Sequence, residues 1–328
     1  MTRGLSEEPL ILAVPSKGRL QENAAAFFAR AGLVFTQVRG SRDYRGSLAG
    51  VPDVEVLFLS ASEIVNQLSS GAAHLGITGE DLVREQIPEA DALVEMLTPL
   101  GFGHANVVVA VPQAWIDVRS MADLDEVAAD TRARHGRKLR VATKYVNLTR
   151  RFFAERGIAD YRIVESLGAT EGAPGAGAAE LVVDITTTGA TLAANALKVL
   201  DDGVMLRSEA NLVASMRAPW GARARAAAQT VLTRIAAEEE ARTSREVRAG
   251  MDPMDLDSLP ALLDRHGASL PYGRPAGAEL VLHCPTARVF DLVAALRALG
   301  GRNVSVRTVD YLFHETNPLS ERLLHRIG

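Results

Sequence analysis

The segment with the most chemical information reads Asp-Ile-Thr-Thr-Thr-Gly-Ala-Thr-Leu and begins at Asp184. An apolar run ends at Asp184-Ile185, a small hydroxyl-rich loop follows, and the spacing then predicts a helix over residues 192–200. A strand, a loop and a helix in this order direct backbone N–H groups and the positive helix end toward one point. That point can hold a phosphate without a lysine, and Asp184 can accept hydrogen bonds from ribose hydroxyls. A threonine-rich helix cap with an ordinary capping aspartate is the alternative.

Two basic side chains, Lys17 and Arg19, lie in a second loop between a predicted strand and a predicted helix. Cations at such a place can stabilise polyphosphate charge and a departing pyrophosphate. Arg42 and Arg45 offer another pair for an anion. For both pairs the alternative is solvated surface charge.

Acidic side chains follow two further predicted strands. Asp81 follows one of them, and Glu165 and Glu171 flank a glycine turn after the other. Ligands gather at the carboxyl ends of strands in open α/β sheets, so these carboxylates could contact a sugar or a magnesium ion. Surface solvation is the alternative for Glu171. The histidines lack metal-ligand spacing, and zinc is not expected.

The elements that must position these residues alternate between strand and helix. Strands are predicted over residues 10–14, 54–59 and 73–78, and Ser62 is a candidate cap for the helix after the second strand. The strands show little alternation of apolar and polar residues. This favours a largely parallel sheet covered on both faces.

The pattern starts again near Leu100, where residues 101–103 (Gly-Phe-Gly) form a candidate hinge. Further strands are predicted over residues 105–111, 140–142, 161–164 and 181–185. Residues 206–215 form a last strand that could return to the first unit.

The remainder of the chain changes in composition. Residues 218–249 are rich in Ala, Arg and Glu at helical spacing, which fits either an interface helix or a solvated connector. Beyond them, a short helix is predicted near Leu259, and strands over residues 279–284 and 304–312 flank a helix over residues 287–299. The pattern indicates a separate small α+β domain.

Length and composition suit a soluble globular protein of two or three domains: 328 residues, 47% hydrophobic and 23% charged. The net charge of -4 argues against a nucleic-acid or membrane-surface partner. The single cysteine, Cys284, cannot form an internal disulfide, which favours the reducing cytoplasm. The polar start of the chain has no apolar signal core, and no apolar run approaches the ~20 residues that span a bilayer.

Together and in this order, these segments resemble ATP phosphoribosyltransferase over nearly all of residues 10–216. The resemblance implies an α/β body of two lobes, like the type II periplasmic binding proteins. Lobe I would comprise residues 1–98 and 195–217, and lobe II residues 99–194. A connector helix over residues 218–242 would lead to a ferredoxin-like, regulatory domain over residues 243–328.

The resemblance also implies roles for individual residues. Phosphoribosyl pyrophosphate would bind to the loop residues Asp184, Thr187, Thr188, Gly189, Ala190 and Thr191. ATP would bind to Lys17, Arg19, Asp81 and Tyr145. Lys17, Arg19 and Asp184 would take part in catalysis, and Glu165 would position the ribose or the adenine. Ala190 departs from the hydroxyl residue often found there, although its amide remains.

The implied reaction is a pentosyl transfer, the first step of histidine biosynthesis. N1 of the ATP adenine attacks C1 of the ribose and pyrophosphate leaves, so no strong base is required. Magnesium would bridge pyrophosphate oxygens, and its protein ligands are left open. The resemblance further implies a cytoplasmic homo-oligomer, a dimer or a hexamer, with histidine as feedback inhibitor on the C-terminal domain.

Three alternatives remain at this point. The first is a non-catalytic two-lobed module that binds a small molecule. The second is a catalytic body that requires a separate regulatory subunit. The third is an orotate- or purine-type phosphoribosyltransferase, in which two adjacent acidic residues usually precede the phosphate loop. Here Val182-Val183 precede Asp184, which disfavours the third.

Overall fold

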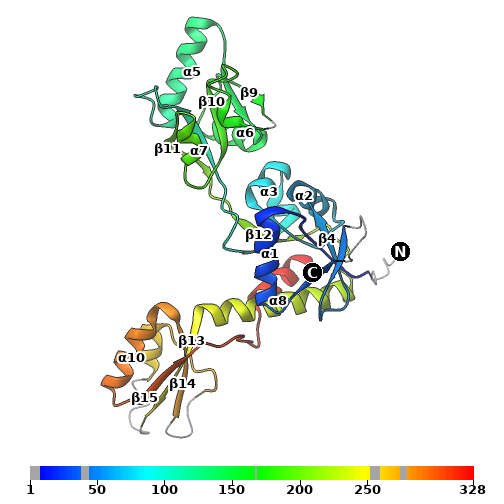
Figure 1. Ribbon diagram of the computed structural model, residues 1–328, viewed down its shortest axis with the longest axis vertical. Coiled ribbons are helices and arrows are strands. Elements are labelled where there is room, and N and C mark those ends of the chain that lie inside the picture. The colour runs from blue at the N-terminus through cyan, green and yellow to red at the C-terminus, as the bar shows by residue number, and fades with distance from the viewer. Residues whose placement is uncertain (1–7, 38–43, 167, 252–258, 274–278) are drawn as a thin grey trace. The chain divides into compact units, whose positions relative to one another are not determined.

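The computed structural model describes residues 8–37, 44–166, 168–251, 259–273 and 279–328 (Figure 1). Chain contacts divide the molecule into two compact units. Unit 1 comprises Met1–Phe27, Phe35–Ala227 and Leu323–Gly328, and unit 2 comprises Phe28–Val34 and Ala228–Arg322. Unit 1 contains two sheets, which with their helices are called lobe I and lobe II below.

Lobe I is built on a seven-stranded sheet in the order β2-β3-β4-β1-β5-β12-β6. Its strands are β1 (Leu10–Pro15), β2 (Phe35–Gln37), β3 (Arg45–Leu48), β4 (Val54–Leu59), β5 (Leu75–Gly79), β6 (Val94–Pro99) and β12 (Ala210–Ser215). Its helices are α1 (Gly18–Arg30), α2 (Ala61–Ser70), α3 (Glu80–Gln86) and α4 (Ala90–Leu93). Buried apolar side chains of α2, α3 and the central strands form one core, among them Ile64, Leu68, Val83 and Val213.

The prediction of a largely parallel sheet is wrong. Only β4 and β5 run parallel to the central strand β1. The hairpin of β2 and β3 adds antiparallel pairs at one edge, and the returning strand β12 is antiparallel to both β5 and β6. Short apolar strands do not reveal direction, because the direction depends on where the connections cross.

The helix α2 is capped by Ser60 and not by Ser62. The Ser60 hydroxyl accepts a hydrogen bond from the amide of Glu63 (3.3 Å), and the Glu63 carboxylate accepts one from the Ser60 amide (2.8 Å). This reciprocal capping box requires a glutamate three residues after the cap, which Ser60 has. Ser62 lies inside the helix.

Lobe II is built on a five-stranded sheet in the order β11-β7-β10-β8-β9. Its strands are β7 (Asn106–Pro112), β8 (Leu139–Thr143), β9 (Tyr161–Glu165), β10 (Leu181–Thr186) and β11 (Leu197–Leu206). Its helices are α5 (Met121–His135), α6 (Val146–Glu155), the 3-10 turn η1 (Thr170–Gly172) and α7 (Ala190–Ala194). β8 is parallel to both β9 and β10, so the carboxyl ends of all three strands meet at one edge.

Two predictions about the end of this lobe are wrong. The helix after the threonine loop stops at Ala194, where Ala196 takes a left-handed φ of 55°, and does not reach Leu200. The following residues form β11, which pairs with β7 of lobe II. The returning segment of lobe I therefore begins at β12 and not at residue 195. Residues 197–206 belong to lobe II because β11 pairs with β7 there.

The chain crosses between the lobes twice, and the two crossing segments pair with each other. The Leu100 amide donates to the Ala210 carbonyl (2.9 Å), and the Ala105 amide donates to the Ser208 carbonyl (2.9 Å). Gly101 and Gly103 both have positive φ, as the predicted hinge allows. Hinge motion itself remains a prediction.

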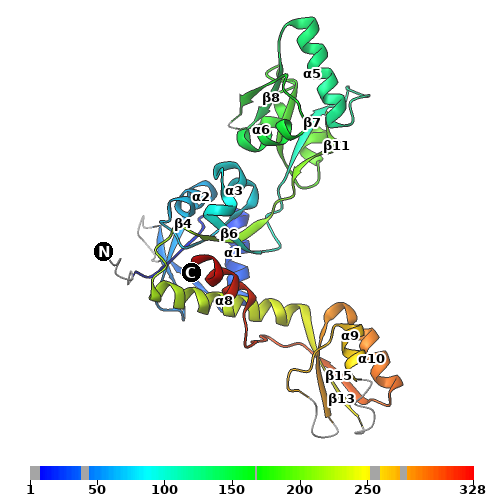
Figure 2. The same ribbon diagram turned by 180° about the vertical axis from the view of Figure 1, so that it is seen from behind.

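Unit 2 contains a three-stranded antiparallel sheet in the order β14-β13-β15. Its elements are β13 (Ser244–Gly250), α9 (Leu259–His266), β14 (Glu279–Pro285), η2 (Thr286–Arg288), α10 (Val289–Ala298) and β15 (Arg302–Arg307). Both helices pack on one face, around Val247, Leu262 and Leu292 (Figure 2). A bridge from Ser269 to His283 stands where a ferredoxin-like sheet has its fourth strand.

The long helix α8 (Ala222–Thr243) is not a solvated connector. Its apolar side chains Val231, Leu232 and Ile235 are buried. Within unit 2 its Glu238, 7% exposed, accepts a hydrogen bond from the Arg30 guanidinium at 3.0 Å. An alanine-rich sequence is typical of a solvated helix as well as of a buried one. In α8 the small alanine side chains allow neighbouring elements to pack closely against the helix.

The sequence predicts that all of residues 243–328 belong to the small domain. This is wrong for the C-terminal segment, because Leu323–Gly328 is part of unit 1. After β15 the chain returns to α8, where the Leu312 amide donates to the Ala237 carbonyl (2.9 Å). α11 (Pro318–Ile327) follows, and its last residues are part of unit 1, where Arg225 donates to the Gly328 carbonyl (2.6 Å). The buried Leu323 explains this return, because an apolar helix face must be covered. Across the ranges described, no helix is both long and apolar enough to cross a membrane.

Candidate active site

Asp81 lies in the first turn of α3, directly after β5, and is 5% exposed. Its carboxylate accepts hydrogen bonds from the Tyr145 hydroxyl at 2.6 Å and from the Ser208 hydroxyl at 3.0 Å. The Asp81 amide donates in turn to the Ser208 oxygen at 2.9 Å. A Cβ at Gly79 would press against this carboxylate, whose two hydrogen bonds oppose its displacement. Asp81 thus ties together lobe I, a crossing segment and lobe II.

Tyr145 lies between β8 and α6 and is 1% exposed. Its amide donates to the Thr143 hydroxyl at 2.8 Å, which fixes the turn. Burial raises the pKa of Tyr145 well above its usual value, and the negative charges of Asp81 and Asp184 raise it further. The phenol therefore stays protonated and serves as a hydrogen-bond donor.

Asp184 lies in β10 just beyond the end of the neighbouring strand β8, because Val183 is in register with Thr143, the last residue of β8. Its carboxylate accepts a hydrogen bond from the Ile185 amide at 2.8 Å. Burial raises the pKa of Asp184 and the charge of Glu171 adds to the rise, whereas the Ile185 amide and Lys144 oppose it. Asp184, Glu171, Lys144 and Tyr145 therefore form one electrostatic cluster at the carboxyl edge of the lobe II sheet.

The threonine loop after Asp184 is closed by its own hydrogen bonds. The Gly189 amide donates to the Thr186 hydroxyl at 2.7 Å, and Gly189 has a left-handed φ of 78°. The Ala190 amide donates to the Thr188 hydroxyl (3.4 Å), and the Thr187 hydroxyl donates to the His104 carbonyl (3.0 Å). The loop borders a pocket of about 320 Å³, lined by His104, Ala105, Ile185, Thr186, Thr187, Thr188, Ala190 and Thr191. Sequence reasoning missed the part that Thr186 plays in closing this loop.

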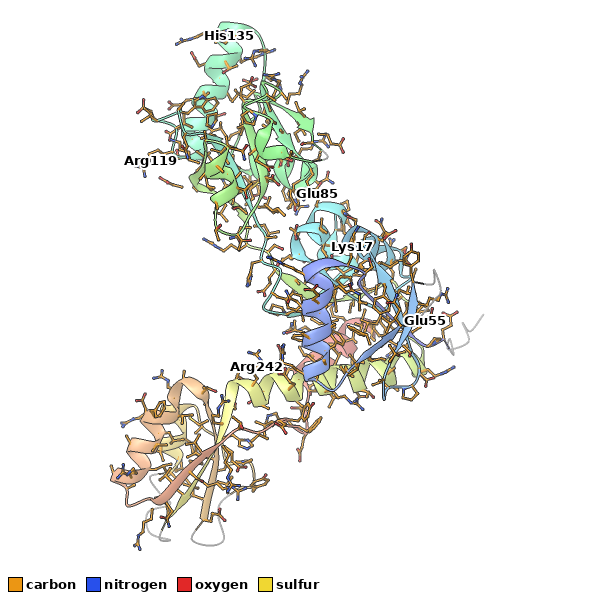
Figure 3. All side chains as sticks on the ribbon, in the orientation of Figure 1. Lys17, Glu55, Glu85, Arg119, His135 and Arg242 are labelled. Carbon is orange, nitrogen blue, oxygen red and sulfur yellow. The ribbon has the colours of Figure 1, made fainter. Side chains whose placement is uncertain are left out.

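Lys17 and Arg19 lie at the start of α1 and are exposed (Figure 3 labels Lys17). Within the described ranges, no ion pair is recorded for either side chain. Arg45 instead pairs with Glu55 at 2.8 Å, and Arg42 lies outside the described residues. Among the predicted cations that the structure describes, Lys17 and Arg19 are thus exposed candidates to bind an anion.

The two candidate carboxylates after β9 differ in their surroundings. Glu165 is exposed at the end of the edge strand β9, where it is in register with Thr143. Glu171 lies in η1, and its charge contributes to the raised pKa of Asp184. The role of Glu165 in positioning the ribose or the adenine stays a prediction.

Glu85, near the end of α3, is a second acidic residue that sequence reasoning missed (Figure 3). Its carboxylate accepts hydrogen bonds from the amides of Asn147 and Leu148, both at 2.9 Å. α6 has no capping side chain of its own, so this carboxylate serves as its cap from another element.

No cluster of three or more metal-ligating side chains is present in the part of the chain that the structure describes. Magnesium binding, which the family resemblance implies, therefore stays a prediction.

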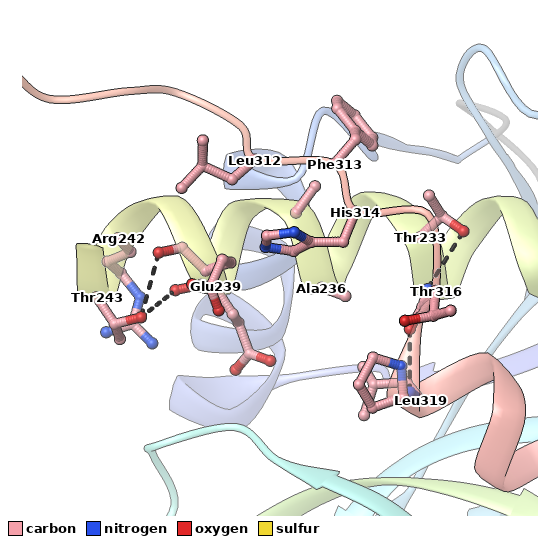
Figure 4. A pocket seen from close by; sticks show the side chains of 14 residues that line it. Thr233, Ala236, Glu239, Arg242, Thr243, Leu312, Phe313, His314, Thr316 and Leu319 are labelled. Carbon is pink, nitrogen blue, oxygen red and sulfur yellow. Dashed lines mark hydrogen bonds between the residues drawn. The ribbon is translucent and has the colours of Figure 1, made fainter. Parts of the chain in front are cut away.

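A second hollow, of about 540 Å³, lies in unit 2 between α8 and residues 312–319 (Figure 4). Its wall includes Glu239, whose pKa is raised by burial, and His314. The raised pKa of Glu239 reflects a surrounding that disfavours negative charge on that side chain. The hollow shares no residue with the cluster around Asp184.

Comparison with known proteins decides the family. The family model of ATP phosphoribosyltransferase matches residues 60–237. A protein of Afipia carboxidovorans named ATP phosphoribosyltransferase is 60% identical over 321 residues, which cover 98% of this chain and 99% of that protein. One of Nitrobacter winogradskyi with the same name is 59% identical over 315 residues, covering 96% and 97%. The chain belongs to the ATP phosphoribosyltransferase family.

The recognition made from the sequence is thereby confirmed, and the chain is a pentosyltransferase of the first step of histidine biosynthesis. The alternative of a non-catalytic binding module does not hold. A solved structure, the ATP phosphoribosyl transferase (HisG:HisZ) complex of Thermotoga maritima, matches with a TM-score of 0.53 and 24% identity. The match covers 69% of this chain and 95% of the Thermotoga maritima chain, and it supports the predicted α/β two-lobed fold.

Proposed function

We propose that the edge of lobe II holds phosphoribosyl pyrophosphate and that the first loop and α3 hold ATP. Phosphate would lie on the loop residues Thr187, Thr188, Gly189, Ala190 and Thr191. Asp184 would accept hydrogen bonds from the ribose hydroxyls. The observation that carries the proposal is the loop pocket, lined by Ile185 and Thr186, next in the chain to the half-buried carboxylate of Asp184.

The nucleotide would lie near Asp81 and Tyr145, with its phosphates toward Lys17 and Arg19. In the transfer, the bond from adenine N1 to ribose C1 forms as the bond from C1 to the pyrophosphate oxygen breaks. The residues align the two substrates, and the two cations stabilise charge on the leaving group. Magnesium would arrive with the pyrophosphate. Glu165 would position the ribose or the adenine, and Glu171, whose charge contributes to the raised pKa of Asp184, would lie near that carboxylate.

The test is turnover of the purified chain alone with ATP, phosphoribosyl pyrophosphate and Mg²⁺. Asp184→Asn keeps the shape of the side chain and removes its charge, and we expect kcat/KM to fall by about 10²-fold because the ribose is misplaced. Asp201→Asn is the matched control in the same lobe, where Asp201 pairs only with the exposed Arg119 among its recorded contacts. Near-normal turnover of Asp184→Asn would contradict the assignment.

We propose in addition that histidine binds the ferredoxin-like domain of unit 2 and inhibits turnover, in a cytoplasmic homo-oligomer that is a dimer or a hexamer. The support is the compact domain appended to the catalytic body. Titration calorimetry with histidine and inhibition of turnover test the first part, and light scattering tests the second. Absence of both heat and inhibition would reject the regulatory role. Turnover of the chain alone also tells whether a separate regulatory subunit is required.

A further inference from the structure

One carboxylate of lobe I holds the start of a helix of lobe II. Glu85, 9% exposed, accepts hydrogen bonds from the amides of Asn147 and Leu148 at 2.9 Å each. The Glu85 carbonyl also accepts a hydrogen bond from the Asn147 side-chain amide at 2.9 Å. Three hydrogen bonds therefore join residues 62 and 63 positions apart in the chain.

The chemistry of this contact favours a full negative charge. The first amides of a helix lack partners inside the helix, and its N-terminus carries partial positive charge. Tyr145, the residue before α6, gives no side-chain cap. Without Glu85, the buried Leu148 amide would lose its partner, which is costly in a place that water does not reach.

The same helix of lobe I reaches the substrate site. Asp81 and Glu85 lie four residues apart on α3, which places them on one face of the helix. Asp81 accepts a hydrogen bond from Tyr145 (2.6 Å), and Glu85 caps the amides two and three residues further along. One face of α3 thus holds the first turn of α6 at two points.

We propose that Glu85 is a positioning residue: it locks α6 to α3, and so holds Tyr145 and the two lobes in the arrangement that binds the nucleotide. The inference rests on the proposed placement of ATP near Asp81 and Tyr145. Loss of the Glu85 carboxylate removes two hydrogen bonds between α3 and α6. The two crossing segments, the bond from Tyr145 to Asp81 and the bond from the Asn147 side chain to the Glu85 carbonyl remain. The binding-competent arrangement is then less populated.

The kinetic test compares Glu85→Gln with Asp123→Asn. Asp123 also accepts hydrogen bonds from two consecutive amides, those of Arg119 (2.9 Å) and Ser120 (2.8 Å), but it caps α5 wholly within lobe II. If the competent fraction falls to about one tenth, KM for ATP rises about tenfold while kcat changes little. The control is expected to leave both constants near their wild-type values. An unchanged KM, or a loss confined to kcat, overturns the proposal.

A second measurement needs no substrate. Spin labels at Asn66→Cys on α2 and Ile116→Cys in lobe II occupy exposed positions, while the native Cys284 is buried. We expect one narrow distance distribution in the otherwise wild-type chain and a broader one after Glu85→Ala or Glu85→Gln. Asp184→Asn is expected to leave the distribution narrow, which separates failure of this inference from failure of the phosphoribosyl site. An equally narrow distance distribution in both Glu85 variants would refute the proposal that Glu85 holds α6 to α3.

Discussion

Replacing Tyr145 by phenylalanine removes one hydroxyl and leaves the packing of the ring in place. That hydroxyl donates to Asp81 over 2.6 Å, and the two side chains are 1% and 5% exposed. A hydrogen bond to a charged group contributes about 1.5–3 kcal/mol, and an acceptor left buried keeps its desolvation cost. Ser208 still donates to the carboxylate at 3.0 Å, so the loss is partial. We expect Tyr145→Phe to lower the free energy of unfolding of unit 1 by about 2 kcal/mol.

The assay is urea unfolding followed by tryptophan fluorescence. Both tryptophans, Trp115 and Trp220, belong to unit 1, so the signal reports on this unit alone. The control is Tyr161→Phe, which also removes one hydroxyl from a tyrosine of lobe II. Tyr161 is half-buried, and its hydroxyl makes no hydrogen bond within the described ranges. We expect that control to change the unfolding free energy by less than about 0.5 kcal/mol.

The pH dependence supplies the refutation. Burial, then the charge of Asp81, raises the pKa of Tyr145 above its ordinary value. A group with a raised pKa in the folded state contributes its full stability below the unfolded pKa of about 10, and loses it only as pH rises through the folded pKa. The difference between wild type and Tyr145→Phe should thus be constant from pH 6 to 9. A difference below about 0.5 kcal/mol, or one that vanishes inside this range, would refute the buried charge-assisted bond.

Two other variants test local features of lobe II. Burial alone would raise the pKa of Glu180, but hydrogen bonds from Arg140 and Arg137 outweigh it and hold the pKa at about 2. Because both guanidiniums are partly exposed, we expect Glu180→Gln to lower the free energy of unfolding by only about 1 kcal/mol at pH 7. This loss should fade as the pH drops from the pKa of glutamate in the unfolded chain toward 2. A loss in urea unfolding that does not depend on pH would contradict this. Gly189→Ala forces a side chain into φ of 78°, which costs about 1 kcal/mol, and should raise KM for phosphoribosyl pyrophosphate. An unchanged KM would show that this loop does not hold the phosphate.

The positions of the chemically active residues could be predicted because they follow from strand order. Asp81, Tyr145 and Asp184 each lie near the carboxyl end of an apolar run, where ligands gather in open α/β sheets. The runs near Tyr145 and Asp184 form the neighbouring parallel strands β8 and β10, whereas the run before Asp81 forms β5 in the sheet of lobe I. The loop chemistry is local as well, since glycine and threonine make the turn themselves. Short-range features of this kind can be predicted from the sequence without knowledge of the fold.

Strand pairing and helix length were harder to predict for a physical reason. Asn195 is a local mark of the end of α7, because it stands at the C-cap and its side-chain amide donates to the Thr191 carbonyl at 2.9 Å. The sequence does not show that residues 197–206 then form a strand. The strand β11 exists because β7 offers it an open edge, and β7 is more than eighty residues earlier in the chain, with Lys198 in register with Val111. Tertiary pairing overrides the local preference there.

The three acidic residues Glu85, Glu165 and Glu171 show where the limit lies for the site. All are charged residues near the end of an element, and composition cannot rank them. The charge of Glu171 contributes to the raised pKa of Asp184, 13 positions further along the chain, and Glu85 accepts hydrogen bonds from amides 62 and 63 positions away. A partial signal does exist: α6 begins at Val146 with no serine, threonine, aspartate or asparagine before it. A buried helix start without its own cap needs a partner from elsewhere, and a carboxylate on a neighbouring helix is the group to look for.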